Sequence, residues 1–192
     1  MKIARTLIAT VTAGLLATSA FALTQPEYEA AKDAISAEYK VSRDKCNALT
    51  DNAKDICIKE AKGHKDVARA ELEAKYKPSP KADYKARVAR ADADYAVAKE
   101  KCDDLSGNAK DVCVKDAKAA HVTAKENAKV AETKASPADT PAAKGAAVSE
   151  ARKDAAEEKN EANYKAAKER CDSMQGDAKS KCVDDAKRMY GQ

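Results

Sequence analysis

Apolar and small residues recur along the chain at alternating spacings of four and three residues. In the middle of the sequence this pattern comprises Tyr84, Val88, Ala91, Tyr95, Ala98, Cys102 and Leu105. A mean spacing near 3.5 residues places such positions on one face of a helix and is typical of a coiled-coil seam. The intervening residues are mainly Ala, Lys, Glu and Arg, which are strong helix formers. The pattern therefore predicts an all-α protein.

The seam belongs to a segment that occurs three times. Its copies read KCNALTDNAKDICIKEAK, KCDDLSGNAKDVCVKDAK and RCDSMQGDAKSKCVDDAK, each with two cysteines eleven positions apart. A tyrosine stands seven residues before the first cysteine of every copy: Tyr39, Tyr95 and Tyr164. The copies follow one another after 56 and then 69 residues. We therefore predict three related modules.

Each copy has a turn signal midway between its cysteines. Gly107 and Gly176 suit the left-handed residue with which many helices end, and Asp51 takes this place in the first copy. The next residue is a good helix N-cap in every copy: Asn52, Asn108 and Asp177. Each module is therefore predicted to be an antiparallel helical hairpin.

The hairpin determines how the cysteines pair. In one continuous helix the two cysteines of a copy would lie about 16 Å apart, whereas a disulfide needs a Cα separation below about 7 Å. Reversal of the chain at the turn brings them face to face. The predicted disulfides are Cys46–Cys57, Cys102–Cys113 and Cys171–Cys182. Each closes a loop of about 12 residues, which in the chain-entropy model contributes about 3 kcal/mol.

The tyrosines are expected to pack above these disulfides. Counting outward from each turn pairs Tyr39 with His64, Tyr95 with Ala120 and Tyr164 with Met189. The third module differs upstream of its tyrosine, where polar residues occupy the seam positions: Lys153, Glu157 and Asn160. Its first helix is therefore predicted to be shorter or frayed.

Prolines and glycine separate the modules. Residues 135–147, ASPADTPAAKGAA, are predicted to form a linker, and Pro78 and Pro80 mark a shorter break. The resulting organisation is a signal peptide (1–22), hairpin 1 (23–77), a short linker (78–80), hairpin 2 (81–134), a Pro/Ala linker (135–147) and hairpin 3 (148–192). Separate modules on linkers would suit multivalent binding. The seams could be completed within a hairpin, between modules or between chains.

The first residues have the features of a cleaved secretory signal. Lys2 and Arg5 precede an apolar run from Leu7 to Leu16, and Ala20 and Ala22 form a small-x-small cleavage site. The run is shorter than the roughly 20 residues that span a bilayer. Cleavage would lower the formal net charge of +4 by two. Export agrees with three cysteine pairs, which predict disulfides and a periplasmic location.

The sequence contains no recognisable catalytic or cofactor-binding motif. A redox dithiol is usually C-x-x-C, and here ten residues separate the cysteines of a pair. His64 follows Cys57 by seven residues and His121 follows Cys113 by eight, but the third copy has no histidine, which argues against a repeated metal site. We therefore expect no catalytic residues, no metal ligands and no cofactor.

The distribution of charge bears on partners. Lysines alternate with Asp and Glu along most of the chain, as on a solvated helical surface, and no basic patch suggests nucleic-acid binding. Contact with a membrane surface is not favoured, because the apolar stripe is mostly alanine rather than the Trp, Phe and Leu of interfacial helices. A protein partner is expected, whereas the oligomeric state is left open.

The repeated pattern C-x2-L/M-x-G/D-N/D-A-K-x2-C, preceded by Y-x6-C, resembles uncharacterised small exported proteobacterial proteins, some of them labelled TolA-like or cell-envelope proteins. The resemblance covers the three hairpin segments, and its TolA part is one of composition alone. It implies a periplasmic helical component of the cell envelope and identifies no functional residue.

Three hypotheses for function follow. The first is a non-enzymatic periplasmic helical-repeat protein with a structural or protein-binding role in the envelope. The second is a periplasmic stress holdase that shields unfolded clients. The third is a thiol or metal buffer.

Overall fold

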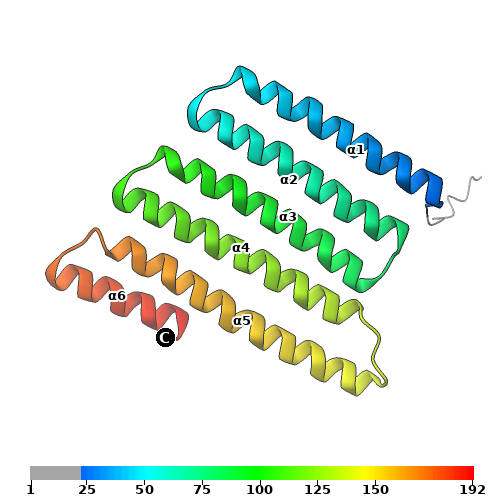
Figure 1. Ribbon diagram of the computed structural model, residues 1–192. Helices are drawn as coiled ribbons and strands as arrows, with labels where there is room; N and C mark the ends of the chain where they lie inside the picture. Colours follow the sequence, from blue (N-terminus) through cyan, green and yellow to red (C-terminus); the bar gives the residue numbers. More distant parts are fainter. Residues whose placement is uncertain (1–22) are drawn as a thin grey trace, which may run out of the picture.

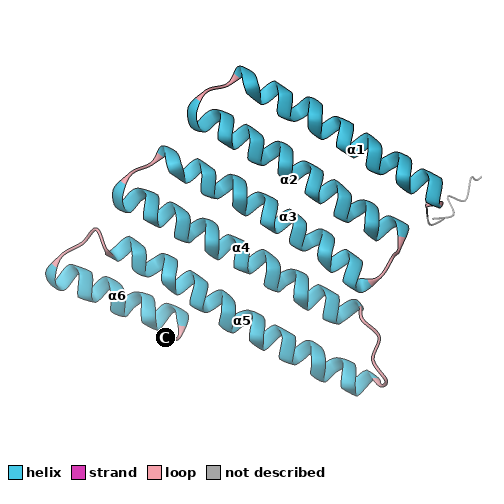
Figure 2. Ribbon diagram, in the orientation of Figure 1, coloured by secondary structure: helices cyan, strands magenta, loops and turns pink. Residues whose placement is uncertain are grey.

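The computed structural model describes residues 23–192, so the predicted signal peptide lies outside the described residues. These residues form six α-helices and no β-strand, which confirms the all-α class (Figure 2). The helices are α1 (Gln25–Lys45), α2 (Asp51–Tyr76), α3 (Pro80–Lys101), α4 (Gly107–Ala135), α5 (Pro141–Cys171) and α6 (Gly176–Tyr190). Two short 3-10 helices, Cys46–Ala48 and Cys102–Asp104, extend α1 and α3.

The helices lie side by side in chain order and form a single antiparallel layer (Figure 1). Each inner helix packs on both of its sequence neighbours, so α2 contacts α1 and α3, and α4 contacts α3 and α5. The expectation of three separate modules joined by linkers is therefore wrong. The helical seams are completed within hairpins and also between them, which makes the three hairpins one continuous array.

Of the prolines that were predicted to separate modules, Pro78 and Pro137 lie between helices, whereas the other two begin helices. Pro80 and Pro141 occupy the first turn of α3 and α5, where the missing N–H would have no intrahelical acceptor. Ser79 and Thr140 cap these helices, because their hydroxyl oxygens accept from the N–H groups of Ala82 and Ala143 at 3.1 Å each. The predicted linker 135–147 is thus helical from Pro141 onward.

Helix α5 contradicts the prediction of a shortened or frayed helix, because its 31 residues make it longer than any other described helix. Lys153 and Glu157 are exposed, with 77% and 69% of their side chains accessible. Ala151 and Ala155 are buried instead, and α6 runs beside only the C-terminal part of α5 (Figure 1). The contact with α4 therefore uses alanines beside the polar positions, and the polar side chains remain in water.

The interior of the layer is thin. Most of the buried residues are alanines, and the largest fully buried side chains are Cys46, Cys102 and Cys171. A methyl group gains little from burial compared with the roughly 1.5–3 kcal/mol of a large apolar side chain. The alanine seam alone would stabilise each hairpin only weakly, and the disulfides supply additional stabilisation.

Candidate functional site: the turn edge of the layer

All three predicted disulfides are confirmed. Their Cα separations are 5.6 Å for Cys46–Cys57, 5.6 Å for Cys102–Cys113 and 5.7 Å for Cys171–Cys182. Each bridge joins the end of one helix to the second turn of the next, just inside the chain reversal. The three reversals lie along the same edge of the layer (Figure 1), which we call the turn edge.

The chain reverses differently from the predicted turn. After the 3-10 helix Cys102–Asp104, Leu105 and Ser106 are extended, and Gly107 then has a φ of 56° and begins α4. Asp51 and Gly176, with φ of 50° and 57°, stand at the equivalent positions. The left-handed residue therefore opens the second helix instead of ending the first. The N-cap position falls to Ser106, so the prediction that Asn108 caps α4 is wrong.

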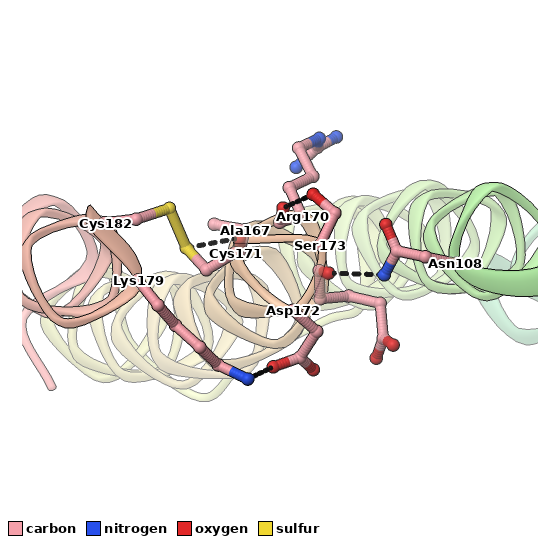
Figure 3. The surroundings of a disulfide bond; sticks show 9 residues. Asn108, Ala167, Arg170, Cys171, Asp172, Ser173, Lys179 and Cys182 are labelled. Carbon is pink, nitrogen blue, oxygen red and sulfur yellow. Dashed lines mark hydrogen bonds and ion pairs between the residues drawn. A yellow bond between two sulfur atoms is a disulfide. The ribbon is translucent and has the colours of Figure 1, made fainter. Parts of the chain in front are cut away.

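The asparagine after the left-handed residue reaches the next hairpin. Asn108 Nδ2 donates to the backbone carbonyl oxygen of Glu169 at 3.0 Å, beside the Cys171–Cys182 disulfide (Figure 3). Asn52 Nδ2 donates in the same way to the carbonyl oxygen of Glu100 at 3.0 Å. Carbonyls in the last turn of a helix lack the usual donor four residues further on, and that of Glu169 also accepts a bond from the N–H of Asp172, three residues on, at 3.1 Å. Each asparagine therefore caps the C-terminal end of a helix in the following hairpin.

Ion pairs repeat at the same two junctions between hairpins. Lys59 Nζ lies 3.5 Å from the carboxylate of Glu100, and Lys115 Nζ lies 3.9 Å from that of Glu169. A second ion pair has the acid on the earlier hairpin and the base on the later one. It joins Glu60 to Lys101 at 3.6 Å, and its equivalent joins Asp116 to Arg170. The junctions are therefore built from one recurring set of polar contacts.

Within the second and third reversals, an ion pair braces the turn. Lys110 Nζ lies 2.8 Å from the carboxylate of Asp103, and Lys179 Nζ lies 2.9 Å from that of Asp172. The hydrogen bond from each lysine lowers the pKa of its aspartate below the usual value. Asn47 replaces the aspartate in the first copy, so the brace is confined to two hairpins.

An exposed large apolar side chain lies in each reversal. Leu49, Leu105 and Met174 are 42%, 45% and 42% exposed and occupy equivalent positions. The sequence pattern placed them in the seam, but the helices end before they are reached, so that part of the prediction is wrong. Interhelical distances of 8–10 Å put neighbouring reversals roughly 20 Å apart. The turn edge therefore carries a row of three apolar residues, which we call the apolar row.

Two of the three tyrosines pack one residue away from their predicted partners. Tyr95 stacks on His121 with ring centroids 4.7 Å apart, and Lys65 Nζ lies 4.3 Å above the ring of Tyr39. His121 and Lys65 each follow the predicted partner by one position. Helical side chains lean toward the N-terminus, so a given point is covered by a residue about one position further along. Met189 is 72% exposed, and its pairing with Tyr164 stays a prediction.

A histidine and a carboxylate meet in the second hairpin. His121 Nε2 lies 2.6 Å from the carboxylate of Asp92, but Lys65 stands at the equivalent position of the first hairpin. Within residues 23–192, no group of three or more His, Cys, Asp or Glu is arranged to hold a metal. An open groove of about 350 Å³ between α1, α2 and α3 is lined by residues that include Tyr39, His64 and Lys65.

None of the six helices carries an apolar stretch of the length needed to cross a membrane. Comparison with protein-family models, curated proteins and solved structures gives no match for this chain. The repeated features of the structure itself are therefore the basis for a functional argument. The sequence pattern had marked the cysteines and the turns, but it gave no sign that the asparagines join hairpins or that Leu49, Leu105 and Met174 are exposed.

Proposed function

We propose that this chain is a non-enzymatic periplasmic protein with a structural or protein-binding role in the cell envelope, and that the apolar row is its binding site. The observation that carries the proposal is the repetition of exposed Leu49, Leu105 and Met174 along one edge. Single exposed apolar residues are common on protein surfaces. Three exposed apolar residues at equivalent positions of three hairpins indicate a binding surface instead, because the disulfides and the junction contacts fix the distances between them.

The three disulfides indicate an oxidising environment outside the cytoplasm. The periplasm in particular is favoured by the signal pattern of residues 1–22. A binding role is favoured over catalysis because the features present in all three hairpins are a disulfide, a turn and an exposed apolar residue. The grouping of Tyr95, His121 and Asp92 occurs in one hairpin alone.

Binding through a fixed row has a consequence for affinity. Each apolar residue contributes a small contact, and the three contacts act together only if the partner matches their spacing. The partner that suits such a row is an elongated protein surface with apolar residues repeated about every 20 Å. The charged side chains around each reversal would form the polar rim of that interface.

The test is periplasmic cross-linking with mass spectrometry on the wild type and a variant in which Leu49, Leu105 and Met174 are all changed to Ser. We expect a partner at fixed stoichiometry with the wild type and its loss with the variant. The control is Met189→Ser, because this side chain is exposed and lies away from the row. Equal recovery of that partner with the wild type and the triple variant would rule out the apolar row as the site.

A holdase is the second candidate, since exposed apolar residues along an edge also suit unfolded chains. In that case the wild type would suppress aggregation of a reduced reporter protein, and the triple serine variant would not. A protein with a defined partner would leave the reporter to aggregate. The two measurements together separate the two functions.

A further inference from the structure

The contacts between hairpins run in one direction. The second helix of one hairpin presents a donor face, and the first helix of the next hairpin presents a receiver face. Two residues are equivalent when they differ by 56 positions between the first and second hairpins and by 69 between the second and third. On this basis the donor face consists of Asn52, Lys59, Glu60 and Gly63 in α2, and of Asn108, Lys115, Asp116 and Ala119 in α4.

The receiver face is the matching surface on α3 and α5. Glu100 supplies its carbonyl to the donor asparagine and its carboxylate to the donor lysine, while Lys101 pairs with the donor acid. Glu169 and Arg170 do the same on α5. The two helices approach closely at Gly63, where an added Cβ would lie 2.8 Å from Cβ of Ala93. A donor face therefore needs a small residue at that position.

Helix α6 occupies the position of a donor helix but lacks the donor residues. Asp177 replaces the asparagine, Asp184 replaces the lysine and Arg188 replaces the small residue, while Asp185 keeps the acid. Asp177 is exposed, and the side chains of Asp184 and Arg188 are 66% and 76% accessible. A carboxylate cannot donate to a helix carbonyl, and arginine is too large for the close approach. The outer face of α6 is therefore unsuited to a further hairpin.

Helix α1, in contrast, keeps the receiver face. Asp44 and Lys45 stand where Glu100 and Lys101 stand in α3, and Ala37 stands where Ala93 does. Val41 is equivalent to Val97, which lines a groove between α2 and α3 together with Gly63 and Ala93. Val41 is 56% exposed, because none of the described residues covers it. The outer face of α1 thus has the chemistry of an internal junction without its partner.

We propose that the outer face of α1 is a docking surface for a helical hairpin of another protein that carries the donor residues, and that α6 is closed to the same pairing. Self-stacking would place Asp184 against Asp44, and Arg188 against Ala37. Like charges and a misplaced large side chain discriminate against the wrong partner. Without these unfavourable contacts, α6 of one copy would pair with α1 of the next, and this head-to-tail interface would extend into filaments.

This inference deepens the proposed binding role and rests on it only in assuming a protein partner, because it concerns a different surface from the apolar row. Its test restores the donor face on α6 with Asp177→Asn, Asp184→Lys and Arg188→Ala, and uses this triple variant as the probe. The charge-matched control changes three exposed residues that form none of the junction contacts described above: Asp55→Asn, Asp111→Lys and Arg152→Ala. Both oxidised proteins are compared with the wild type by sedimentation velocity at low salt.

We expect the triple variant to associate at least roughly tenfold more tightly than the wild type and the control. Adding Ala37→Arg to the triple variant should return that variant to a monomer, because the arginine blocks the receiver face on the outer side of α1. A mixture of this blocked variant with the wild type should give a 1:1 complex, because only the wild type receives and only the variant donates. Circular dichroism confirms that each variant remains helical.

Two results would overturn the proposal. One is a folded triple variant that stays as monomeric as the control at all concentrations. The other is association that persists unchanged with Ala37→Arg, since the pairing would then not use α1. Either result leaves the apolar row untouched, because Leu49, Leu105 and Met174 are intact in all of these variants. Failure of this inference is therefore distinguishable from failure of the proposed function.

Discussion

Asn108 joins two hairpins by donating its side-chain amide to the backbone carbonyl oxygen of Glu169. The same bond from Asn52 to Glu100 joins the first hairpin to the second. Both asparagines directly follow the left-handed residue of their turns, which aims them away from their own hairpin. The reversal of the chain and the stacking of hairpins therefore depend on neighbouring residues of one short motif.

Replacing Asn108 with Ala should lower the free energy of unfolding by about 1 kcal/mol, because the half-buried carbonyl of Glu169 loses one of its two donors and keeps the N–H of Asp172. Urea unfolding of the oxidised protein measures the change. The matched control is Asp177→Asn, which occupies the equivalent position on the outer face of α6 and should alter stability by less than about 0.5 kcal/mol. Equal effects of the two substitutions would show that the junction bond is not responsible.

The disulfides should differ in what they protect. Removing Cys102–Cys113 with two Ala substitutions should lower the free energy of unfolding by about 3 kcal/mol. Removing Cys171–Cys182 should instead release α6 locally, because this helix packs on α5 alone among the described helices. Hydrogen exchange would then speed up in Gly176–Tyr190 and remain slow in α3 and α4. Uniform acceleration along the chain would contradict this local release.

The approach of α2 to α3 depends on Gly63. An added Cβ would lie 2.8 Å from Cβ of Ala93, so Gly63→Leu should force the two helices apart and lower the free energy of unfolding by about 1–3 kcal/mol. Gly145 in α5 has no atom within 4 Å of an added Cβ. Gly145→Ala should therefore raise stability by up to about 1 kcal/mol through helix propensity. Thermal unfolding of the two variants checks these opposite signs.

The turn braces predict a dependence on pH. The hydrogen bond from Lys110 lowers the pKa of Asp103. A lowered carboxyl pKa stabilises the turn at pH above the unfolded value, and this stabilisation is lost as the pH falls through the folded value. Replacing Lys110 with Ala should raise the pKa of Asp103 toward its ordinary value and leave that of Asp172 unchanged. Carboxyl titration by NMR measures both, and an unchanged Asp103 would disprove the brace.

Local features of the sequence were sufficient for the hairpins. The cysteine spacing and the turn residues between the cysteines predicted all three disulfides, because a loop of this length closes only if the chain reverses. The partners of Tyr39 and Tyr95 were off by one residue, since the lean of helical side chains shifts each contact along the helix. Pro141 was predicted to lie in a linker but begins α5. Proline is unfavourable inside a helix and favourable at its first position, so the residue type alone does not separate the two roles.

The packing of the hairpins against one another could not be predicted from local features of the sequence. Contacts such as Lys59–Glu100 and Gly63–Ala93 join residues from different copies of the repeat. Each of these residues is an ordinary member of a charged or alanine-rich helix when the sequence is read alone. Their complementarity becomes visible only when the helices lie side by side.

The sequence by itself determined the helices, the reversals and the disulfide pairing of this protein, because these depend on periodicity and on residues close together in the chain. Tertiary structure alone decided that the hairpins form one layer, that Leu49, Leu105 and Met174 are exposed, and that the outer faces of α1 and α6 differ. The physical reason is that these properties depend on which surfaces meet. Weak contacts between small and charged residues decide which surfaces meet, and these residues do not stand out from the helical periodicity of the sequence.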